Sequence, residues 1–236
     1  DVVVQHASQR RDVVLHVARG RHDHHGGASH DVIAGHEQAI LLDQEARNLA
    51  FVADPQSGKL QEPFLRVTHL LRALRYNVSG TLLPYDLGTA VTETIIGQYP
   101  LSSPSVFNFY LPDYEPPGPI AAAGLVGPEF QILNSVFGIL TPNVVYNLVV
   151  NGSAAGSFTV DLSPQFALGG NPTALVDNVD LLLTRGMLSA STKAKVLDVV
   201  NGVTTAMVPS GSTIEQTRAR LAVYLIAISP DFAVLK

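Results

Sequence analysis

Apolar and polar residues follow one another along most of this chain with the spacing of helices, and residues that start or stop helices bound the segments. Only GSFTVDLSP, residues 156–164, indicates extended structure. We therefore predict an all-α fold, an irregular multi-helix domain with one long ordered loop. The predicted helices cover residues 31–47, 62–75, 88–100, 128–140, 171–186, 189–202 and 212–230.

The helix predicted over residues 62–75 begins with Pro63, which suits the first turn because its missing N–H has no partner there anyway. Its apolar stripe should face the core and consists of Phe64, Val67, Leu71 and Leu74. Arg66 and His69 are polar residues of this helix, one turn apart. Such a pair can bind an anion, but an ordinary polar helix face is the interpretation that we prefer.

Capping residues mark the C-terminal helices. Asn171 and Ser189 should each cap the helix that follows, because their side-chain oxygens can accept from free backbone N–H groups. Ser212 and Glu215 have the spacing of a capping box at the start of the last helix. This helix should be part of the core and bury the stripe Leu221, Tyr224, Leu225 and Ile228.

Residues 103–130, SPSVFNFYLPDYEPPGPIAAAGLVGPEF, combine many prolines with aromatic side chains and few charges. Proline fixes φ, which lowers the entropy lost when a loop becomes ordered. We predict a long loop that stays ordered because it packs its own side chains on the helices.

Two interpretations of this loop stay open. It can be a structural plug, in which Phe107 and Phe109 are core residues while Asn108 and Asp113 satisfy loop backbone groups. It can instead be a platform that binds sugar rings or an extended peptide. The contact residues of the platform would be Asn108, Tyr110, Asp113, Tyr114 and Glu129.

Side chains of an extended backbone point alternately to opposite faces. We therefore expect Phe107 and Phe109 to face the helices, and Tyr110 and Tyr114 to lie nearer solvent. Asp113 and Glu129 could also form a carboxylate pair of the kind that hydrolases use. Capping of neighbouring backbone by these carboxylates is the interpretation that we prefer.

Histidine is concentrated at the beginning of the chain, where seven of the eight histidines lie within the first 36 residues. His22, His24 and His25 could ligate a metal ion. A polar, glycine-bearing segment without packed neighbours holds ligands poorly, so we favour a solvated segment and expect no cofactor. We predict that residues 1–30 are a poorly ordered His/Arg-rich segment and that residues 31–236 form the helical domain.

Composition limits the class of protein. Hydrophobic residues make up 46% of the 236 residues and charged residues 15%, which is ample material for a core. The formal net charge of -5 gives no basic footprint for nucleic acid. No apolar run is long enough for a membrane span. The chain has no cysteine, which excludes disulfides and thiolate chemistry within it.

Four blocks of the sequence resemble, in the same order, the bacterial family catalogued as domain of unknown function 1800. They are AILLDQEAR (39–47), GKLQEPFLRVTHLLRAL (58–74), residues 103–132, and the tail from Leu175 to Lys236. The resemblance runs from about residue 31 to the end. It implies a largely helical protein that is commonly exported, outside the cytoplasm, and that has no established activity.

The resemblance also bears on partners. It covers the C-terminal half of the family pattern, and the chain starts at Asp1 without a methionine. We therefore expect a missing N-terminal half to be one partner, with an exported sulfatase-like protein as another. The first function hypothesis is a noncatalytic binding or scaffolding module. The alternative is the substrate platform of a hydrolase-like enzyme that acts on extracellular or envelope polymers.

Overall fold

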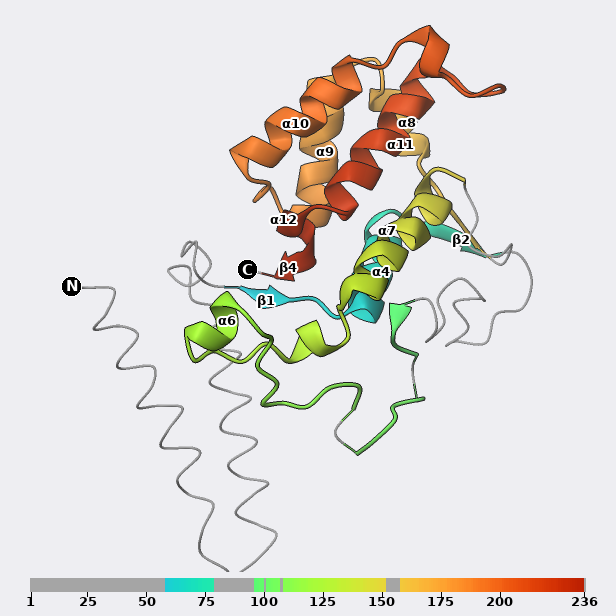
Figure 1. Ribbon diagram of the computed structural model, residues 1–236. Coiled ribbons are helices and arrows are strands. Elements are labelled where there is room, and N and C mark those ends of the chain that lie inside the picture. The colour runs from blue at the N-terminus through green and yellow to red at the C-terminus, as the bar shows by residue number, and fades with distance from the viewer. Residues whose placement is uncertain (1–57, 79–95, 100, 107, 152–157, 236) are drawn as a thin grey trace, which may run out of the picture. The chain divides into compact units, whose positions relative to one another are not determined.

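Helices dominate the part of the chain that the structure describes. The computed structural model describes residues 58–78, 96–99, 101–106, 108–151 and 158–235 (Figure 1). The helix expected at 31–47 and the histidine segment lie outside these residues, as does most of the helix expected at 88–100. Within the described ranges no helix is long and apolar enough to cross a membrane.

The all-α prediction is confirmed, with two short strand pairs added. The α-helices are α4 (Pro63–Ala73), α6 (Pro119–Ala122), α7 (Ser135–Val149), α8 (Ser163–Leu168), α9 (Pro172–Thr184), α10 (Ala190–Asn201), α11 (Ile214–Ala227) and α12 (Pro230–Ala233). Two 3₁₀ turns are η1 (Pro128–Gln131) and η2 (Thr205–Met207). The strands are β1 (Lys59–Leu60), β2 (Tyr76–Val78), β3 (Phe158–Val160) and β4 (Val234–Leu235).

Each short strand pair joins segments that are far apart in the sequence. β2 and β3 are antiparallel, which confirms the extended structure expected around residues 156–164. β1 and β4 are antiparallel as well, with Lys59 opposite Leu235. A further backbone bond, from Gln61 N to Ala233 O at 2.8 Å, continues this pairing. The start of α4 is thereby fixed beside the C-terminal end of the described chain.

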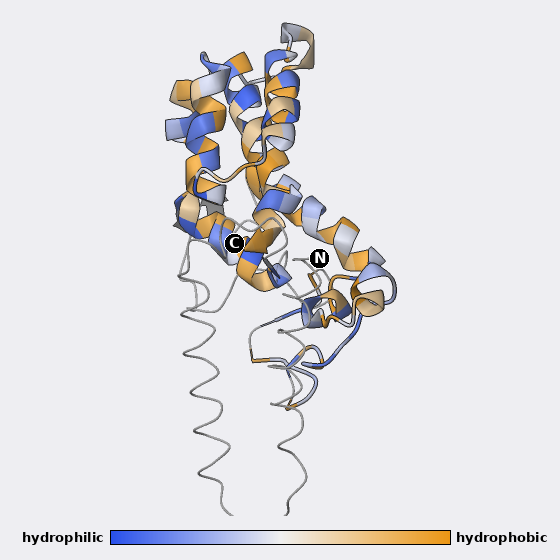
Figure 2. Cartoon of the chain, turned by 90° about the vertical axis from the view of Figure 1, so that its left-hand side faces the viewer, coloured by the Kyte–Doolittle hydropathy of each residue, from blue (hydrophilic) through white to orange (hydrophobic). Residues whose placement is uncertain are grey.

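The core is centred on α11, which contacts α7, α8, α9 and α10 (Figure 1). Apolar and polar residues lie side by side on these helices, as the colours of Figure 2 show. Of the face Leu175, Val179 and Leu182 that the pattern of α9 predicts, Leu175 and Val179 are buried and Leu182 is partly buried. The buried apolar residues of α11 are Ala219, Ala222, Val223, Ile226 and Ala227.

The stripe predicted for α11 was therefore wrong. Leu221, Tyr224, Leu225 and Ile228 are only partly buried, at the flanks of the buried face. The small alanines face inward because a helix with neighbours on several sides needs short side chains where those neighbours come closest. Size and hydrophobicity alone favoured the larger residues beside them.

Most helix starts agree with the expected capping chemistry. Asn171 Oδ1 accepts from Ala174 N at 3.2 Å, and Ser189 Oγ accepts from Thr192 N at 3.3 Å. Pro63 is the first residue of α4, as expected. Each of these signals lies within one helical turn, so tertiary contacts did not override it.

The capping box of α11 lies one residue later than predicted. Thr213 Oγ1 accepts from Gln216 N at 3.2 Å, and Gln216 Oε1 accepts from Thr213 N at 3.1 Å. Ser212 instead accepts from Nη1 of Arg220 at 3.0 Å. Both residue pairs have capping-box chemistry, so composition could not separate the two registers.

The helix expected over residues 128–140 is two elements. Pro128 begins only η1, and Asn134 then caps α7 by accepting from Val136 N at 2.9 Å and from Phe137 N at 3.2 Å. Helix α7 continues past the expected end and contains Pro142. The side chain of Asn134 accepts hydrogen bonds from the backbone N–H groups that a continuous helix would pair with carbonyls, so a new helix begins there.

Gly169 allows a close approach between the end of α8 and the start of α11. A Cβ at this position would lie 2.5 Å from both Cα and the carbonyl oxygen of Glu215. Such a distance is far below van der Waals contact, and the obstacle is backbone that cannot rotate away. Gly170 is its natural control, since a Cβ there would meet nothing within 4 Å.

We expect Gly169→Ala to lower the free energy of unfolding by about 1–3 kcal/mol, the usual cost of overpacking. Gly170→Ala should be neutral or slightly stabilising, because alanine loses less backbone entropy on folding. Urea unfolding of the two variants measures the difference. Equal stabilities would show that α8 and α11 do not approach each other as closely as described.

Candidate functional site

The loop of residues 103–130 is ordered by hydrogen bonds, and its described residues include no helix other than α6 and the start of η1. Gly127 N donates to Tyr114 O at 2.8 Å, which brings together the two arms of the loop. Leu111 N donates to Gln131 Oε1 at 2.8 Å. The prediction of a long ordered loop is thus confirmed for the described residues.

Asn108 breaks the alternation on which the side-chain directions were predicted. Its φ of 71° lies in the left-handed region, and its N–H donates to Ser105 O at 3.2 Å to close a tight turn. The backbone is therefore not extended at Asn108, so the strict alternation from which the side-chain directions were predicted does not hold there. Asn108 is exposed and Phe109 is half-buried, while Phe107 lies outside the described residues.

Tyr110 holds the loop against the start of α4. Its hydroxyl donates to Glu62 Oε1 at 2.6 Å. The other carboxylate oxygen, Glu62 Oε2, accepts from Gln98 Nε2 at 2.6 Å. Gln98 is buried, and its Oε1 accepts from Phe64 N at 3.1 Å. The chain of bonds satisfies a free N–H at the helix start, which has no side-chain cap of its own.

The electrostatics of Tyr110 keep its hydroxyl protonated, as its hydrogen bond to Glu62 requires. Burial raises the pKa of Tyr110 above its usual range, and the hydrogen bond to Glu62 and the negative charges of Glu62 and Glu129 add to the shift. The phenol therefore stays protonated at physiological pH. Tyr110 is half-buried, so it lies deeper than the solvent-facing position expected for it.

Glu129 is buried and forms an ion pair with Lys59, at 3.2 Å between Nζ and Oε1. Asp113, in contrast, is exposed. The two carboxylates therefore lie in different environments, which gives no support to a catalytic pair. Tyr114 is half-buried like Tyr110, but no described residue holds its hydroxyl by a hydrogen bond, so the candidate contact residues that stay accessible are Asn108, Asp113 and Tyr114.

Arg66 is buried and not part of a polar surface as expected. Its Nη2 donates to Ala227 O at 2.8 Å, and its guanidinium lies 5.8 Å from the ring centre of Phe232. Burial lowers the pKa of Arg66 to about 10, so the group stays charged at neutral pH. Arg66 therefore satisfies the C-terminal end of α11 and is not free to bind an anion with His69.

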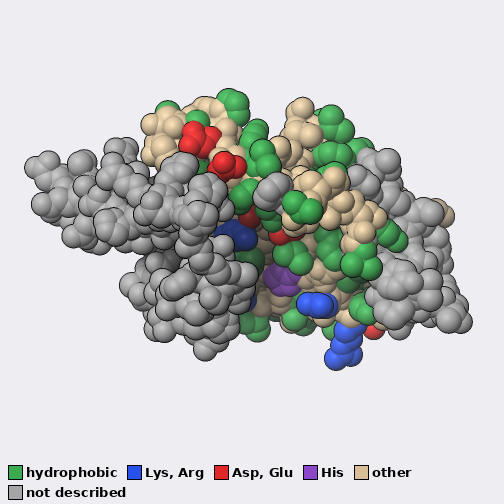
Figure 3. All heavy atoms as spheres, turned by 90° about the horizontal axis from the view of Figure 1, so that it is seen from below, with side chains coloured by type: hydrophobic (Ala, Val, Ile, Leu, Met, Phe, Trp, Pro, Cys, Tyr) green, Lys and Arg blue, Asp and Glu red, His purple; other side chains and the backbone are tan. Residues whose placement is uncertain are grey.

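His69 lines a pocket of about 250 Å³ on the described unit. Figure 3, seen from below, shows the histidine side chain exposed in a hollow with cationic side chains beside it. The polar lining consists of Gln61, His69, Thr184, Arg185 and Asp231, and the apolar lining includes Leu183, Phe232 and Leu235. The ring of His69 also packs on Phe232, with 5.0 Å between centres.

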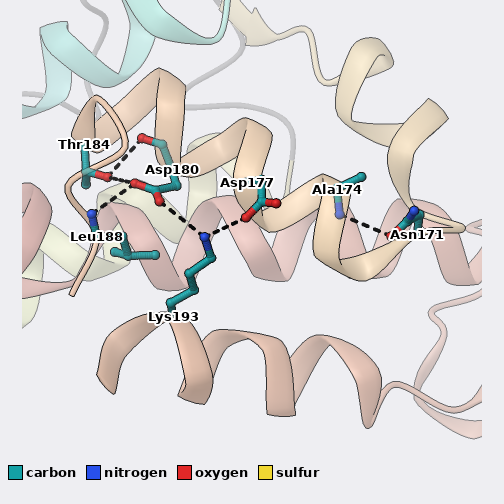
Figure 4. A network of polar contacts seen from close by, with 7 residues as sticks. All are labelled: Asn171, Ala174, Asp177, Asp180, Thr184, Leu188 and Lys193. Atoms are coloured by element: carbon teal, nitrogen blue, oxygen red, sulfur yellow. Dashed lines mark hydrogen bonds and ion pairs between the residues drawn. The ribbon is translucent and has the colours of Figure 1, made fainter. Parts of the chain in front are cut away.

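A buried carboxylate fixes the turn that carries Arg185. Asp180 Oδ1 accepts from Thr184 Oγ1 and from Leu188 N, the second bond at 3.0 Å (Figure 4). Lys193 of α10 lies 3.8 Å from Asp180 Oδ2 and 2.6 Å from Asp177 Oδ1. These contacts hold Arg185 as the left-handed end of α9, with φ of 59°.

Several members of these clusters were missed from the sequence. Glu62 and Gln98 carry no motif, although the position of Glu62 just before Pro63 marks a helix start. Arg185 was missed because most of the pocket that it lines comes from other elements. No group of three or more metal-ligating side chains occurs in the described ranges, and His22, His24 and His25 lie outside them.

Comparison with known proteins identifies one family. The family model described as protein of unknown function (DUF1800) matches residues 12–234. The match begins within the His/Arg-rich segment, before residue 31 where the resemblance was placed. The comparisons with curated proteins and with solved structures found no match.

Proposed function

Since this chain belongs to the DUF1800 family, whose function is unknown, we propose a function from its geometry: a noncatalytic binding module. The loop of residues 103–130 is the proposed binding surface. The observation that carries the proposal is that some residues of the loop hold it in place while others stay accessible. Tyr110 is tied to Glu62 of the scaffold, while Asn108, Asp113 and Tyr114 remain accessible.

An ordered loop is a better binding surface than a flexible one because little entropy is lost when the ligand binds. The prolines and the hydrogen bonds of Leu111 and Gly127 supply that order before any ligand arrives. The ring of Tyr114 offers a flat apolar face, and the side chains of Asn108 and Asp113 offer polar partners nearby in sequence. Sugar rings and extended peptides are ligands that such surfaces suit.

Two carboxylates, Glu62 at the start of α4 and Glu129 in the loop, favour binding over hydrolysis. Glu62 accepts two short hydrogen bonds, and Glu129 is ion-paired with Lys59. A carboxylate that serves as general acid or base needs an unengaged oxygen that faces the substrate. We therefore prefer the binding module to the substrate platform of a hydrolase-like enzyme.

The proposal includes a location and partners. We place the module outside the cytoplasm of a bacterium, where it would bind an extracellular or envelope polymer. A further N-terminal half and an exported sulfatase-like protein are the partners proposed for it. This part rests on the family resemblance, and fractionation of the native cells would test it.

Tyr114→Ala should abolish retention of the protein on a peptidoglycan or polysaccharide column while leaving the fold intact. A half-exposed ring makes few contacts, so the free energy of unfolding should fall by less than about 1 kcal/mol. Tyr76→Ala is the matched control, because Tyr76 is an exposed tyrosine of β2 outside the loop. The platform would be excluded if Tyr114→Ala were retained as strongly as the unchanged protein. It would also be excluded if the column did not retain the unchanged protein.

A further inference from the structure

The pocket beside His69 is built from three segments that are distant in the sequence. Gln61 and His69 come from the region of β1 and α4, Arg185 ends α9, and Asp231 and Phe232 belong to α12. The pairing of β1 with β4 and the hydrogen bonds of Asp180 fix these segments independently of any ligand. The pocket is therefore preformed, as small-molecule sites usually are.

Arg185 supplies an unpaired positive charge. Its guanidinium makes no hydrogen bond or ion pair with the described residues, although it lines the pocket. The residue adopts φ of 59°, a conformation that arginine rarely adopts and that costs free energy. A guanidinium of this kind can bind a carboxylate through two parallel hydrogen bonds.

Gln61 supplies an unused acceptor. Its side chain is only 4% exposed, and its Oε1 is buried without a hydrogen-bond partner among the described residues. Its Nε2 lies 3.5 Å from Nδ1 of His69. A buried oxygen without a partner is costly, so a rotation of the Gln61 amide that brings this oxygen to a ligand hydroxyl in the pocket would be favoured.

The imidazole of His69, which lines the pocket, is neutral at physiological pH. Burial lowers the pKa of His69, and the positive charges of Arg185 and Arg72 lower it further. The neutral imidazole can face an uncharged part of a ligand without a desolvated charge of its own.

Asp231 limits the charge of the ligand. Its Oδ1 accepts from Ser189 N at 3.3 Å, and its Oδ2 accepts from Ser189 Oγ at 3.1 Å and from Thr192 Oγ1 at 2.5 Å. The carboxylate is thus engaged with the start of α10, but its negative charge offsets that of Arg185. A singly charged anion suits this lining better than a dianion such as phosphate.

We propose that this pocket binds a small hydroxy-monocarboxylic acid. The carboxylate pairs with Arg185, the hydroxyl donates to Oε1 of Gln61, and the apolar body packs on Phe232 and the leucines of the lining. The volume of about 250 Å³ suits a ligand smaller than most drug molecules. None of the described residues that line the pocket belongs to the loop of residues 103–130, so this proposal can be tested independently of the proposed function.

Mandelate is the probe, because it joins one carboxylate, one adjacent hydroxyl and a phenyl ring. Titration calorimetry of the 236-residue chain should show binding at one site. 1-Phenylethane-1,2-diol, which lacks the carboxylate, should bind about tenfold or more weakly, and phenylacetate, which lacks the hydroxyl, about fivefold. Inorganic phosphate should compete no better than acetate.

Arg185→Gly removes the cation and relieves the backbone, since glycine adopts positive φ freely. It should weaken mandelate binding about tenfold or more without loss of folding stability. Arg72→Gln is the matched control, because this exposed cation influences His69 but does not line the pocket. Its affinity for mandelate should stay within about twofold of the unchanged protein.

Three results would overturn the proposal. One is the absence of mandelate binding by the unchanged protein at millimolar concentration. Another is equal affinity for mandelate and the diol, or stronger competition by phosphate, either of which removes the carboxylate from the argument. The third is Arg185→Gly protein that binds mandelate as the unchanged protein does. Tyr114→Ala should leave mandelate affinity unaltered, which separates this site from the loop.

Discussion

Ile226→Ala is expected to lower the free energy of unfolding by about 2–5 kcal/mol, the range measured for large-to-small changes in protein cores. Ile226 is fully buried on α11, and α11 contacts five other helices of the described unit, α7, α8, α9, α10 and α12. Truncation removes apolar contacts and leaves a cavity that neighbours fixed on several sides cannot fill by moving. The loss should therefore lie toward the upper end of that range.

Leu225→Ala is the matched control for this experiment. The two residues are adjacent on one helix and differ in burial, since Leu225 is only partly buried at the edge of the core. Leu225→Ala should cost less than about 2 kcal/mol. Urea unfolding of both variants gives the comparison, and a larger loss for Leu225 than for Ile226 would mean that α11 turns its other face to the core.

Local signals account for most of what the sequence predicted correctly. Asn171, Ser189 and Pro63 mark helix starts in the structure as they do in the sequence, because each acts on backbone groups within one turn. The buried face of α11 was misjudged because its alanines count little in a hydrophobic pattern. Which face of a helix needs small side chains depends on neighbours that the pattern does not contain.

The candidate sites depend on long-range contacts and were predicted less well. The bond of Tyr110 to Glu62 joins the loop to a helix start far upstream, and neither residue lies in a motif. Arg66 has the sequence context of a surface residue, yet its guanidinium donates a hydrogen bond to the carbonyl oxygen of Ala227 inside the fold. A lone charged residue in a helical pattern does not reveal whether a distant backbone group satisfies it.

The two interpretations of the loop apply to different residues of the same segment. Tyr110 has the hydrogen-bonded position expected of a plug, whereas Asn108 and Asp113 are exposed and the half-buried Tyr114 keeps an accessible ring, as a platform needs. A loop can serve both roles when one ring holds it in place and another stays accessible. The effect of Tyr114→Ala on retention is therefore the more informative experiment, since loss of Tyr110 would disturb the fold and the surface together.

Asp180→Ala is expected to lower the free energy of unfolding by about 2–5 kcal/mol, because two hydrogen bonds to a buried carboxylate are lost and the N–H of Leu188 is left without an acceptor. Asp180 is 5% exposed, and its carboxylate accepts from the hydroxyl of Thr184 and the backbone N–H of Leu188 (Figure 4). The N–H of Leu188 would lose its acceptor. Lys193 would keep Asp177, so the ion pair on the outer side should survive.

Asp180→Asn separates the hydrogen bonds from the charge. Its amide keeps an oxygen that can accept from Leu188 N, so it should lose clearly less stability than Asp180→Ala. Since the same bonds hold the turn that carries Arg185, Asp180→Ala should also weaken mandelate binding at temperatures where the variant is still folded. Thermal unfolding and calorimetry on the two variants test both effects. Wild-type stability and mandelate affinity in Asp180→Ala would mean that the turn at Arg185 is held by something other than this carboxylate.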